Sequence, residues 1–388
     1  MTTKEKYGKH VMKTYKQLEM VIVKGQNATC YDEEGKEYID FGSGIGVNSL
    51  GYANADWSAA VAKQASTLQH VSNLYFSQPM AELSEKVCAL SGYSRLFLSN
   101  SGAEANECAI KVARKYSSDK YGENRNKILS LYNSFHGRTM ATLSATGQEA
   151  MHKHFFPFNE GFDFASASDI AEVKGKLEEG GFCAVIFEFI QGEGGVVPLE
   201  QDFITELFAY CKEKDILTIA DEVQTGIGRT GKFLASQHFA VKPNITSLAK
   251  GLGGGLPIGG VLVDDLCQDV LGYSDHGSTF GGNPVACAGA NVVMSYLQKP
   301  DFLPEVSKKG AYLKEKLLAM KEVEGVDGIG MMLGVRLKTK KSPEVLAEAV
   351  SRGLIPLTAK EKIRLLPPLT ISMEELEKGL EILGEVLN

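Results

Sequence analysis

The sequence predicts an α/β fold, with a mainly parallel sheet between helices in a large domain and a smaller α+β domain beside it. Between about residues 52 and 298, short apolar runs alternate with segments of helical periodicity. Such alternation predicts right-handed crossovers and a parallel sheet. The two ends of the chain lack it. A chain of 388 residues, 44% of them hydrophobic, is long enough to bury the cores of two domains.

The elements of the large domain are predicted from local patterns. Short apolar runs bounded by turn residues indicate buried strands, and they lie at residues 95–98, 127–131, 183–187, 216–220 and 245–248. Amphipathic helical patterns lie at residues 106–116 and 203–211. Because ligands bind outside the carboxyl ends of parallel strands, we expect functional residues where these runs end, including Ser101 and Asp221.

The two chain ends together predict the small domain. Residues 21–25 and 31–40 are expected to form short antiparallel strands around an acidic turn. Near the C-terminus, helical patterns flank a strand region from Gly328 to Leu337 and an extended segment at residues 362–368. The predicted division is residues 1–50 and 299–388 for the small domain and residues 51–298 for the large domain.

Composition and charge exclude several classes of function. The net charge of −7 and the lack of a basic block argue against a nucleic-acid partner. The N-terminus is polar, and no apolar run approaches the ~20 residues that span a bilayer. The seven cysteines are scattered without a Cys-x-x-Cys pair, which favours reduced thiols. His152 and His154 have no further ligand nearby, so no metal site is expected. We predict a cytoplasmic protein.

Lys250 is the most informative residue. It follows the strand-like run at residues 245–248 and opens a glycine-rich turn, in an otherwise uncharged stretch. A lysine in a loop is usually a solvated surface charge, but this setting indicates an enclosed amine. Upstream, Asp221 ends a buried run. Pyridoxal phosphate requires a lysine to form a Schiff base and a carboxylate to keep the pyridine nitrogen protonated. The two residues therefore predict a pyridoxal phosphate site.

Three further segments fit this cofactor. Residues 99–106 lie between a strand and a helix, where backbone N–H groups can hold a phosphate; the same residues could equally form a capping box of Ser101 and Glu104. Residues 135–139 offer an aromatic to stack on the ring and an arginine for a carboxylate, or simply a buried Phe and a surface Arg. Residues 277–284 suit a phosphate or an ordinary turn.

Two nucleotide-binding motifs fail on inspection. Residues 226–232 follow the spacing of a phosphate-binding loop, but Phe233 stands where a Ser or Thr must bind magnesium. Gly251 and Gly253 begin a dinucleotide pattern whose last glycine would fall on Leu256.

The chain resembles the class-III aminotransferases, which are fold-type-I pyridoxal phosphate enzymes, over nearly its whole length. The matching segments, in chain order, are Ser101–Asn106, Phe135–Thr139, Gln191–Gly195, Asp221–Gly231, Ala249–Gly251, Gly277–Pro284 and Arg364–Pro368. The resemblance implies pyridoxal 5'-phosphate as cofactor and a homodimer as the active unit. It implies that Lys250 carries the cofactor and that Asp221 partners the pyridine nitrogen. The other cofactor-binding residues that it implies are Ser101, Gly102, Ala103, Phe135, Val223, Gln224 and, on the phosphate of the neighbouring subunit, Thr279.

Within the family the chain most resembles members that use N-acetylornithine. This implies transfer of the donor's ω-amino group to 2-oxoglutarate, giving N-acetylglutamate 5-semialdehyde and glutamate, a step of arginine biosynthesis. Arg138 would bind the donor carboxylate and Arg364 that of 2-oxoglutarate, with Ser278 also at the substrate. Glu193, the third implied catalytic residue, would pair with Arg364 while the donor is bound. A fixed, unpaired buried arginine would penalise a donor with an uncharged tail.

Alternatives and departures remain at this stage. Ile45 and His136 replace the tyrosine and tryptophan usual in ornithine enzymes, which disfavours ornithine. Succinylated donors, 4-aminobutyrate and, less well, ornithine stay open, as do an intramolecular aminomutase of the glutamate-1-semialdehyde type and a non-catalytic protein of the same fold. Residues 51–55 and Phe189 depart from the family pattern, which often has Gly-His-x-His-Pro and a proline there.

Overall fold

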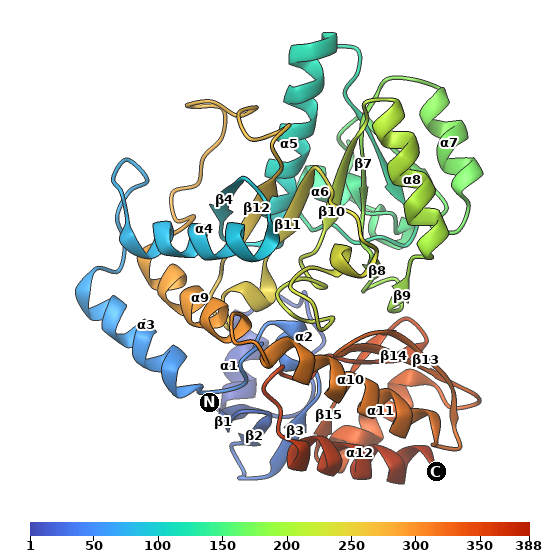
Figure 1. Cartoon of the computed structure of the whole chain (residues 1–388). Helices are drawn as coiled ribbons and strands as arrows, with labels where there is room; N and C mark the ends of the chain where they lie inside the picture. Colours follow the sequence, from blue (N-terminus) through green and yellow to red (C-terminus); the bar gives the residue numbers. More distant parts are fainter.

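The large part of the molecule is built on one seven-stranded sheet, in the order β4-β12-β11-β10-β7-β5-β6 (Figure 1). All 388 residues are described by the computed structural model. Only β12 runs antiparallel to its neighbours, and the other pairs are parallel, which confirms the predicted mainly parallel sheet. The strands are β4 (Arg95–Ser99), β5 (Lys127–Leu131), β6 (Phe162–Ala165), β7 (Phe182–Phe187), β10 (Leu217–Asp221), β11 (Ile245–Leu248) and β12 (Gly259–Val263).

Helices cover both faces of this sheet. All six residues of β7 are buried. Ala184 and Ile186 pack in the core under α5 (Gly102–Tyr121), whereas Val185 and Phe187 pack under α8 (Gln201–Glu213) on the opposite face. Successive side chains of a strand point to opposite faces, so a sheet covered on both faces needs continuous apolar runs. This is why the runs at residues 127–131 and 183–187 predicted strands. The helices of the second face are α7 (Ile170–Glu178) and α8 (Gln201–Glu213).

A third apolar core lies at the β4 edge of the sheet. It is formed largely by residues of α4 (Gln78–Ser91) and α9 (Pro284–Leu297), and Trp57 of α3 (Ala55–Thr67) packs against it. The short helix α6 (Met140–Ala145) follows β5. No helix has both the length and the apolar character needed to cross a membrane. All seven cysteines are free.

The smaller part joins the two ends of the chain, which lie together at the bottom of Figure 1 in blue and red. One sheet has the order β1-β2-β3-β15, and its N-terminal hairpin is antiparallel, as predicted. Ile39 and Phe41 share one core with C-terminal residues such as Leu313 and Leu376. The strands of this sheet are β1 (Ile22–Gln26), β2 (Thr29–Asp32), β3 (Glu37–Asp40) and β15 (Leu354–Ile355).

A second small sheet has the order β13-β14-β17-β16. The region from Gly328 to Leu337, predicted as a strand region, contains the end of one strand, a turn and the second strand of a hairpin, because Gly330 reverses the chain with φ +59°. The domain boundaries at residues 50 and 298 stay a prediction. The remaining elements are α1 (Thr3–His10), α2 (Ser43–Gly46), β8 (Ile190–Gln191), β9 (Val197–Pro198), α10 (Phe302–Leu318), β13 (Val323–Ile329), β14 (Met332–Leu337), α11 (Ser342–Ser351), β16 (Leu357–Ala359), β17 (Lys362–Leu365) and α12 (Met373–Leu387).

Candidate active site

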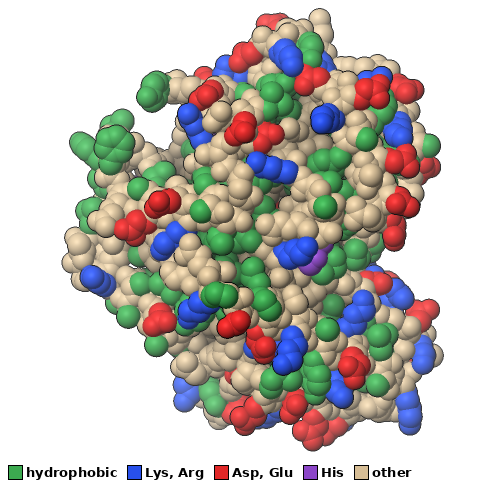
Figure 2. Space-filling model, viewed as in Figure 1, with side chains coloured by type: hydrophobic (Ala, Val, Ile, Leu, Met, Phe, Trp, Pro, Cys, Tyr) green, Lys and Arg blue, Asp and Glu red, His purple; other side chains and the backbone are tan.

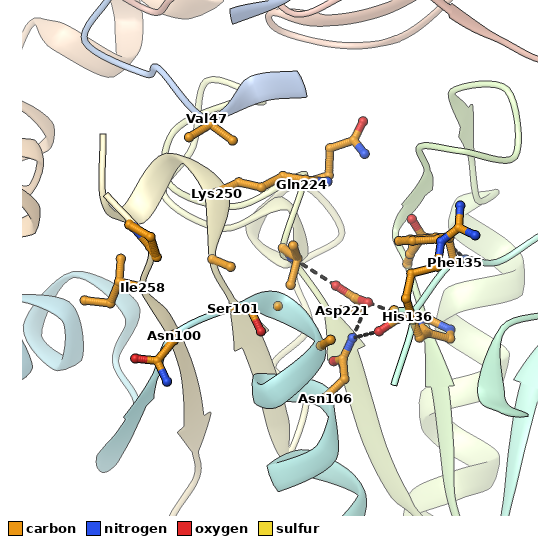
Figure 3. Close-up of a pocket in the computed structure, with 18 of the residues that line it drawn as sticks. Val47, Asn100, Ser101, Asn106, Phe135, His136, Asp221, Gln224, Lys250 and Ile258 are labelled. Atoms are coloured by element: carbon orange, nitrogen blue, oxygen red, sulfur yellow. Dashed lines mark hydrogen bonds and ion pairs between the residues drawn. The ribbon is translucent and has the colours of Figure 1, made fainter. Parts of the chain in front are cut away.

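A cavity of about 440 Å³ lies at the carboxyl ends of β5, β7, β10 and β11, beside the first turn of α5 (Figure 3). Its volume suits a small-molecule site. Each of these strands delivers one or more polar side chains to its wall. Of the residues predicted from the sequence, the cavity brings together Ser101, Gly102, Ala103, Phe135, Arg138, Asp221, Val223, Gln224 and Lys250. Glu193, Ser278, Thr279 and Arg364 do not line it.

Asp221 is held by three donors from three different elements. Its Oδ2 accepts from Asn106 Nδ2 at 2.7 Å and from His136 Nδ1 at 2.9 Å, and its Oδ1 accepts from Val223 N at 3.0 Å. Figure 3 shows the carboxylate between the Asn106 and His136 side chains. A carboxylate oxygen only accepts, so His136 carries a proton on Nδ1. The buried Nε2 of His136 has no partner. The result is a rigid, 4% exposed carboxylate suited to hold a protonated ring nitrogen.

Lys250 leaves β11 directly into the 3-10 turn Lys250–Leu252, with a positive φ of 44°. This conformation is unfavourable for a residue with a side chain, and such strain is concentrated at functional sites. Burial lowers the pKa of Lys250, an effect opposed by the charge of Glu193 but strengthened by that of Arg364. A neutral amine is the nucleophilic form. The structure thus makes Lys250 the enclosed amine that the sequence predicted.

The first turn of α5 opens onto the cavity. Ser101 is its N-cap, and its Oγ accepts from Glu104 N at 3.2 Å. The predicted capping box is wrong in its second half, because the Glu104 carboxylate accepts from Asn100 N at 2.7 Å instead of from Ser101 N. Gly102 leaves room for Val223, since a Cβ at Gly102 would lie 2.7 Å from Val223 Cγ1. The first N–H groups of a helix have no partner within the helix, and here they lie beside the cavity, where they can bind an anion.

Arg138 is a free cation at the edge of the cavity. It is exposed, makes no ion pair, and its guanidinium carbon lies 5.5 Å from the centroid of the Phe135 ring. Both residues follow β5 on one loop, and both line the cavity. A guanidinium in this position can bind a carboxylate with two hydrogen bonds.

Arg364 of β17 is a second arginine, already paired. Its Nη1 lies 2.5 Å from Glu193 Oε1 and 3.3 Å from the Oε1 of the cavity-lining Gln224. Burial acts to raise the pKa of Glu193, but the charge and hydrogen bond of Arg364 outweigh it and lower the pKa. The Nε of Arg364 is buried without a partner. Gln224 therefore separates the Arg364–Glu193 pair from the cavity, and the Nε of Arg364 can still donate to another acceptor.

Ser278 and Thr279 lie on the loop between β12 and α9, outside the cavity. Ser278 Oγ accepts from Asn100 Nδ2 at 3.0 Å, so this loop touches the segment before α5. Thr279 is exposed. Within one chain the structure does not bring Thr279 to the predicted phosphate site.

Three residues at the site were missed from the sequence. Asn106 and His136 orient Asp221 as described above. Glu188 lines the cavity and is 5% exposed; burial, and next the charge of Asp221, raise its pKa to about 8. A signal for Glu188 was available, because it is the single acid at the end of an apolar run, as Asp221 is.

The departures from the family pattern pack away from the cavity. Tyr52 donates its hydroxyl to Asp40 Oδ2 at 2.7 Å. Phe189 is fully buried and packs against Phe187 and Phe239, with ring centroids 5.1 and 5.0 Å apart. Both contribute to packing and remove no polar group from the site. No group of His, Cys, Asp and Glu side chains is placed to hold a metal ion.

The chain is similar to known proteins of one family over nearly its whole length. The family model "Aminotransferase class-III" matches residues 11–387. The chain is 48% identical over 380 residues to the acetylornithine aminotransferase of Haemophilus ducreyi, covering 98% of this chain and 96% of the relative. It is 47% identical to that of Aquifex aeolicus, covering 97% and 100%.

Solved structures of aminotransferases superpose on nearly the whole chain. The ornithine aminotransferase of Toxoplasma gondii superposes with a TM-score of 0.94 at 29% identity, covering 100% of this chain and 95% of the other. The N-acetylornithine aminotransferase of Stenotrophomonas maltophilia superposes with a TM-score of 0.85 at 33% identity, covering 96% of each chain.

Proposed function

The chain belongs to the class-III aminotransferases, which depend on pyridoxal phosphate, and on that premise we propose that it transfers the ω-amino group of N-acetylornithine to 2-oxoglutarate. The products are N-acetylglutamate 5-semialdehyde and glutamate. The observation that carries this proposal is the presence of two arginines in different states: Arg138 is free at the cavity edge, whereas Arg364 is buried and paired with Glu193. The names of the curated relatives, 39–48% identical, support the donor.

The residues present fit pyridoxal phosphate. Lys250 would hold it covalently, Asp221 would keep its ring nitrogen protonated, and the N–H groups of Gly102 and Ala103 would hold its phosphate. The buried Nε2 of His136, next to Asp221, has no hydrogen-bond partner within the protein. This part of the site can therefore bind a further polar group. When bound, the cofactor supplies an electron sink that stabilises a substrate carbanion. The Lys250 amine would also be placed to hold a proton at Nζ and to transfer it to and from substrate carbon.

The two arginines divide the substrates by charge. The α-carboxylate of N-acetylornithine would bind Arg138, and its uncharged acetamido tail leaves Arg364 with Glu193, so no buried cation stays unpaired. 2-Oxoglutarate has a second carboxylate, which would take the place of the Glu193 carboxylate on Arg364. The unpartnered Nε of Arg364 supports this exchange, because a bidentate carboxylate would satisfy it.

The active unit that we propose is a homodimer. Large apolar side chains protrude from the α3–α4 and β12–α9 loops, at the left edge of Figure 2; they include Leu74, Phe76 and Tyr273, which are 88%, 109% and 105% exposed. Asn73 ties the two loops by donating to Ser278 O and Gly281 O, both at 3.0 Å. An apolar surface of this kind indicates a protein partner. A second copy would cover it and carry Thr279 to the phosphate site of its neighbour.

Two experiments test these proposals. A panel of N-acetylornithine, N-succinylornithine, ornithine and 4-aminobutyrate with 2-oxoglutarate should give N-acetylornithine the highest kcat/KM; a higher value for another donor overturns the donor but not the class. For the dimer, chains carrying Lys250→Ala and Thr279→Ala are mixed after unfolding. Hybrid dimers hold one site with both defects and one intact site, so part of the activity should return. A fully active monomer contradicts shared sites.

We also propose that the protein is cytoplasmic. Cell fractionation tests this location, and recovery in the membrane fraction would contradict it.

A further inference from the structure

Glu188 connects the two loops that carry the substrate-binding charges. It follows β7, whose Phe187 pairs with Ala220 of β10, so Glu188 and Asp221 leave neighbouring strands together. Its Oε2 accepts from Phe135 N at 3.0 Å, and its Oε1 accepts from Gly192 N at 3.2 Å. Each carboxylate oxygen therefore holds the backbone of a different loop.

Both contacts fall directly beside the charged groups. Phe135 lies three residues before Arg138 on the loop after β5, and Gly192 is adjacent to Glu193. A second tie joins the same loops farther back, where Gln191 Nε2 donates to Tyr132 O at 2.9 Å. Gly192 also packs tightly, since a Cβ there would lie 2.5 Å from Gln224 Nε2. The position of Gly192 thus also affects Gln224, the contact of Arg364.

We propose that Glu188 is a positioning residue that sets the spacing between Arg138 and the Glu193–Arg364 pair. A carboxylate can accept one backbone N–H on each oxygen, whereas a glutamine of the same size has only one acceptor. A buried carboxyl is costly unless it is hydrogen-bonded. Burial and the charge of Asp221 raise the pKa of Glu188, while the two N–H donors and Lys250 act the other way. The assignment of one substrate to each loop rests on the proposed function. The link that Glu188 makes between the two loops does not depend on it.

Glu222 provides a matched control. Like Glu188, it is buried and accepts two backbone N–H groups, from Ala235 at 2.5 Å and Ser236 at 2.9 Å. These donors belong to a segment that includes neither substrate loop. Glu188→Gln removes one of the two acceptors, and Glu188→Met removes both at similar side-chain volume. Glu222→Gln removes an acceptor from the Ala235–Ser236 segment and serves as the control.

The test is hydrogen–deuterium exchange of the holoenzymes, followed by the KM and kcat of each substrate. Glu188→Met should raise amide exchange at Phe135 and at Gly192 by about 10- to 100-fold, the effect of leaving a buried or half-buried N–H donor without its acceptor. Glu188→Gln should raise it in one of the two loops. The substrate whose KM rises should then be the one served by that loop, the donor for Phe135 or 2-oxoglutarate for Gly192. Glu222→Gln should raise exchange only near Ala235 and Ser236.

Several results would overturn the proposal. The proposal fails if the exchange rate at Phe135 or at Gly192 in Glu188→Met equals that of the wild type. It also fails if the control Glu222→Gln raises the KM of both substrates equally. If Glu188→Met yields no folded holoenzyme, Glu188→Gln decides alone, and unchanged exchange in both loops refutes the link. Failure of N-acetylornithine as donor leaves the exchange results unaffected, so the two claims fail separately.

Discussion

Arg364 and Glu193 form an ion pair of 2.5 Å between a small-sheet strand and the turn after β8, and the pair leaves Arg364 Nε without a partner. A pair with all of its donors satisfied would resist exchange. Here one donor is unmet and the cavity wall at Gln224 is within hydrogen-bonding distance of the guanidinium. This geometry would let Arg364 exchange the Glu193 carboxylate for a substrate carboxylate, so that one site could accept both an acetylated donor and a dicarboxylate.

Glu193→Gln tests this exchange. Loss of the carboxylate leaves Arg364 as a buried cation while the donor is bound, which should lower kcat/KM for N-acetylornithine by ~10- to 100-fold, or ~1.4–3 kcal/mol. The KM for 2-oxoglutarate should stay the same or fall, because Arg364 is always free. Pre-steady-state cofactor conversion with each substrate alone makes the comparison. Equal losses in both half-reactions would refute the scheme.

Arg138→Ala should act on the donor. A bidentate carboxylate contact in a partly desolvated site contributes ~2–4 kcal/mol, so kcat/KM for N-acetylornithine should fall ~30- to 1,000-fold. Glutamate, which can also use Arg364, should lose less. Arg138→Lys keeps the charge without the bidentate geometry, so its kcat/KM for N-acetylornithine should lie between those of the wild type and Arg138→Ala. If both substrates lose equally in Arg138→Ala, the arginine does not discriminate between them.

Lys250→Ala should abolish covalent attachment of the cofactor. Borohydride reduction of the wild type should label a peptide containing Lys250, and the variant should give neither the label nor measurable turnover. Asp221→Ala should retain the label but lose most of its turnover, because the ring nitrogen then lacks its charge partner. Near wild-type transamination by Lys250→Ala would remove this lysine from the mechanism.

Burial raises the pKa of Glu222 from its usual 4.5 to about 7. The folded state then binds the proton more tightly than the unfolded state, so this stabilisation is complete below pH ~4.5 and is lost as the pH rises through ~7. At 1.36 kcal/mol per pH unit, the loss amounts to roughly 3 kcal/mol. Urea unfolding between pH 5 and 8 should show the wild type losing stability relative to Glu222→Gln. A constant difference across this range would contradict the assignment.

Much of the sheet could be predicted because a parallel sheet covered on both faces requires continuous apolar runs. Lys250 and Asp221 could be placed for the same reason, since each ends such a run. The pairing of Glu193 with Arg364 could not, because 171 positions separate them and only the tertiary fold joins β17 to the turn after β8. The resemblance to a family suggested the pairing, whereas periodicity did not.

Other features depend on neighbours that local patterns do not contain. The sequence predicted a strand region at residues 328–337 but not its hairpin with the preceding strand, because the turn at Gly330 interrupts no apolar pattern. The Glu104 carboxylate accepts from the backbone N–H of Asn100 rather than from that of Ser101, and Asn100 Nδ2 donates to its other oxygen at 3.1 Å. Glu188 was overlooked although its position after β7 repeats that of Asp221 after β10.

The central claim is that this cavity moves the ω-amino group of N-acetylornithine to 2-oxoglutarate, and nitrogen tracing tests it most directly. The purified holoenzyme is supplied with unlabelled 2-oxoglutarate and N-acetylornithine carrying ¹⁵N only at the ω-amino position, and glutamate is analysed by mass spectrometry. We expect ¹⁵N in glutamate, one for each semialdehyde formed, and none without 2-oxoglutarate. Label that stays on the donor skeleton, or moves within it without 2-oxoglutarate, would contradict the account.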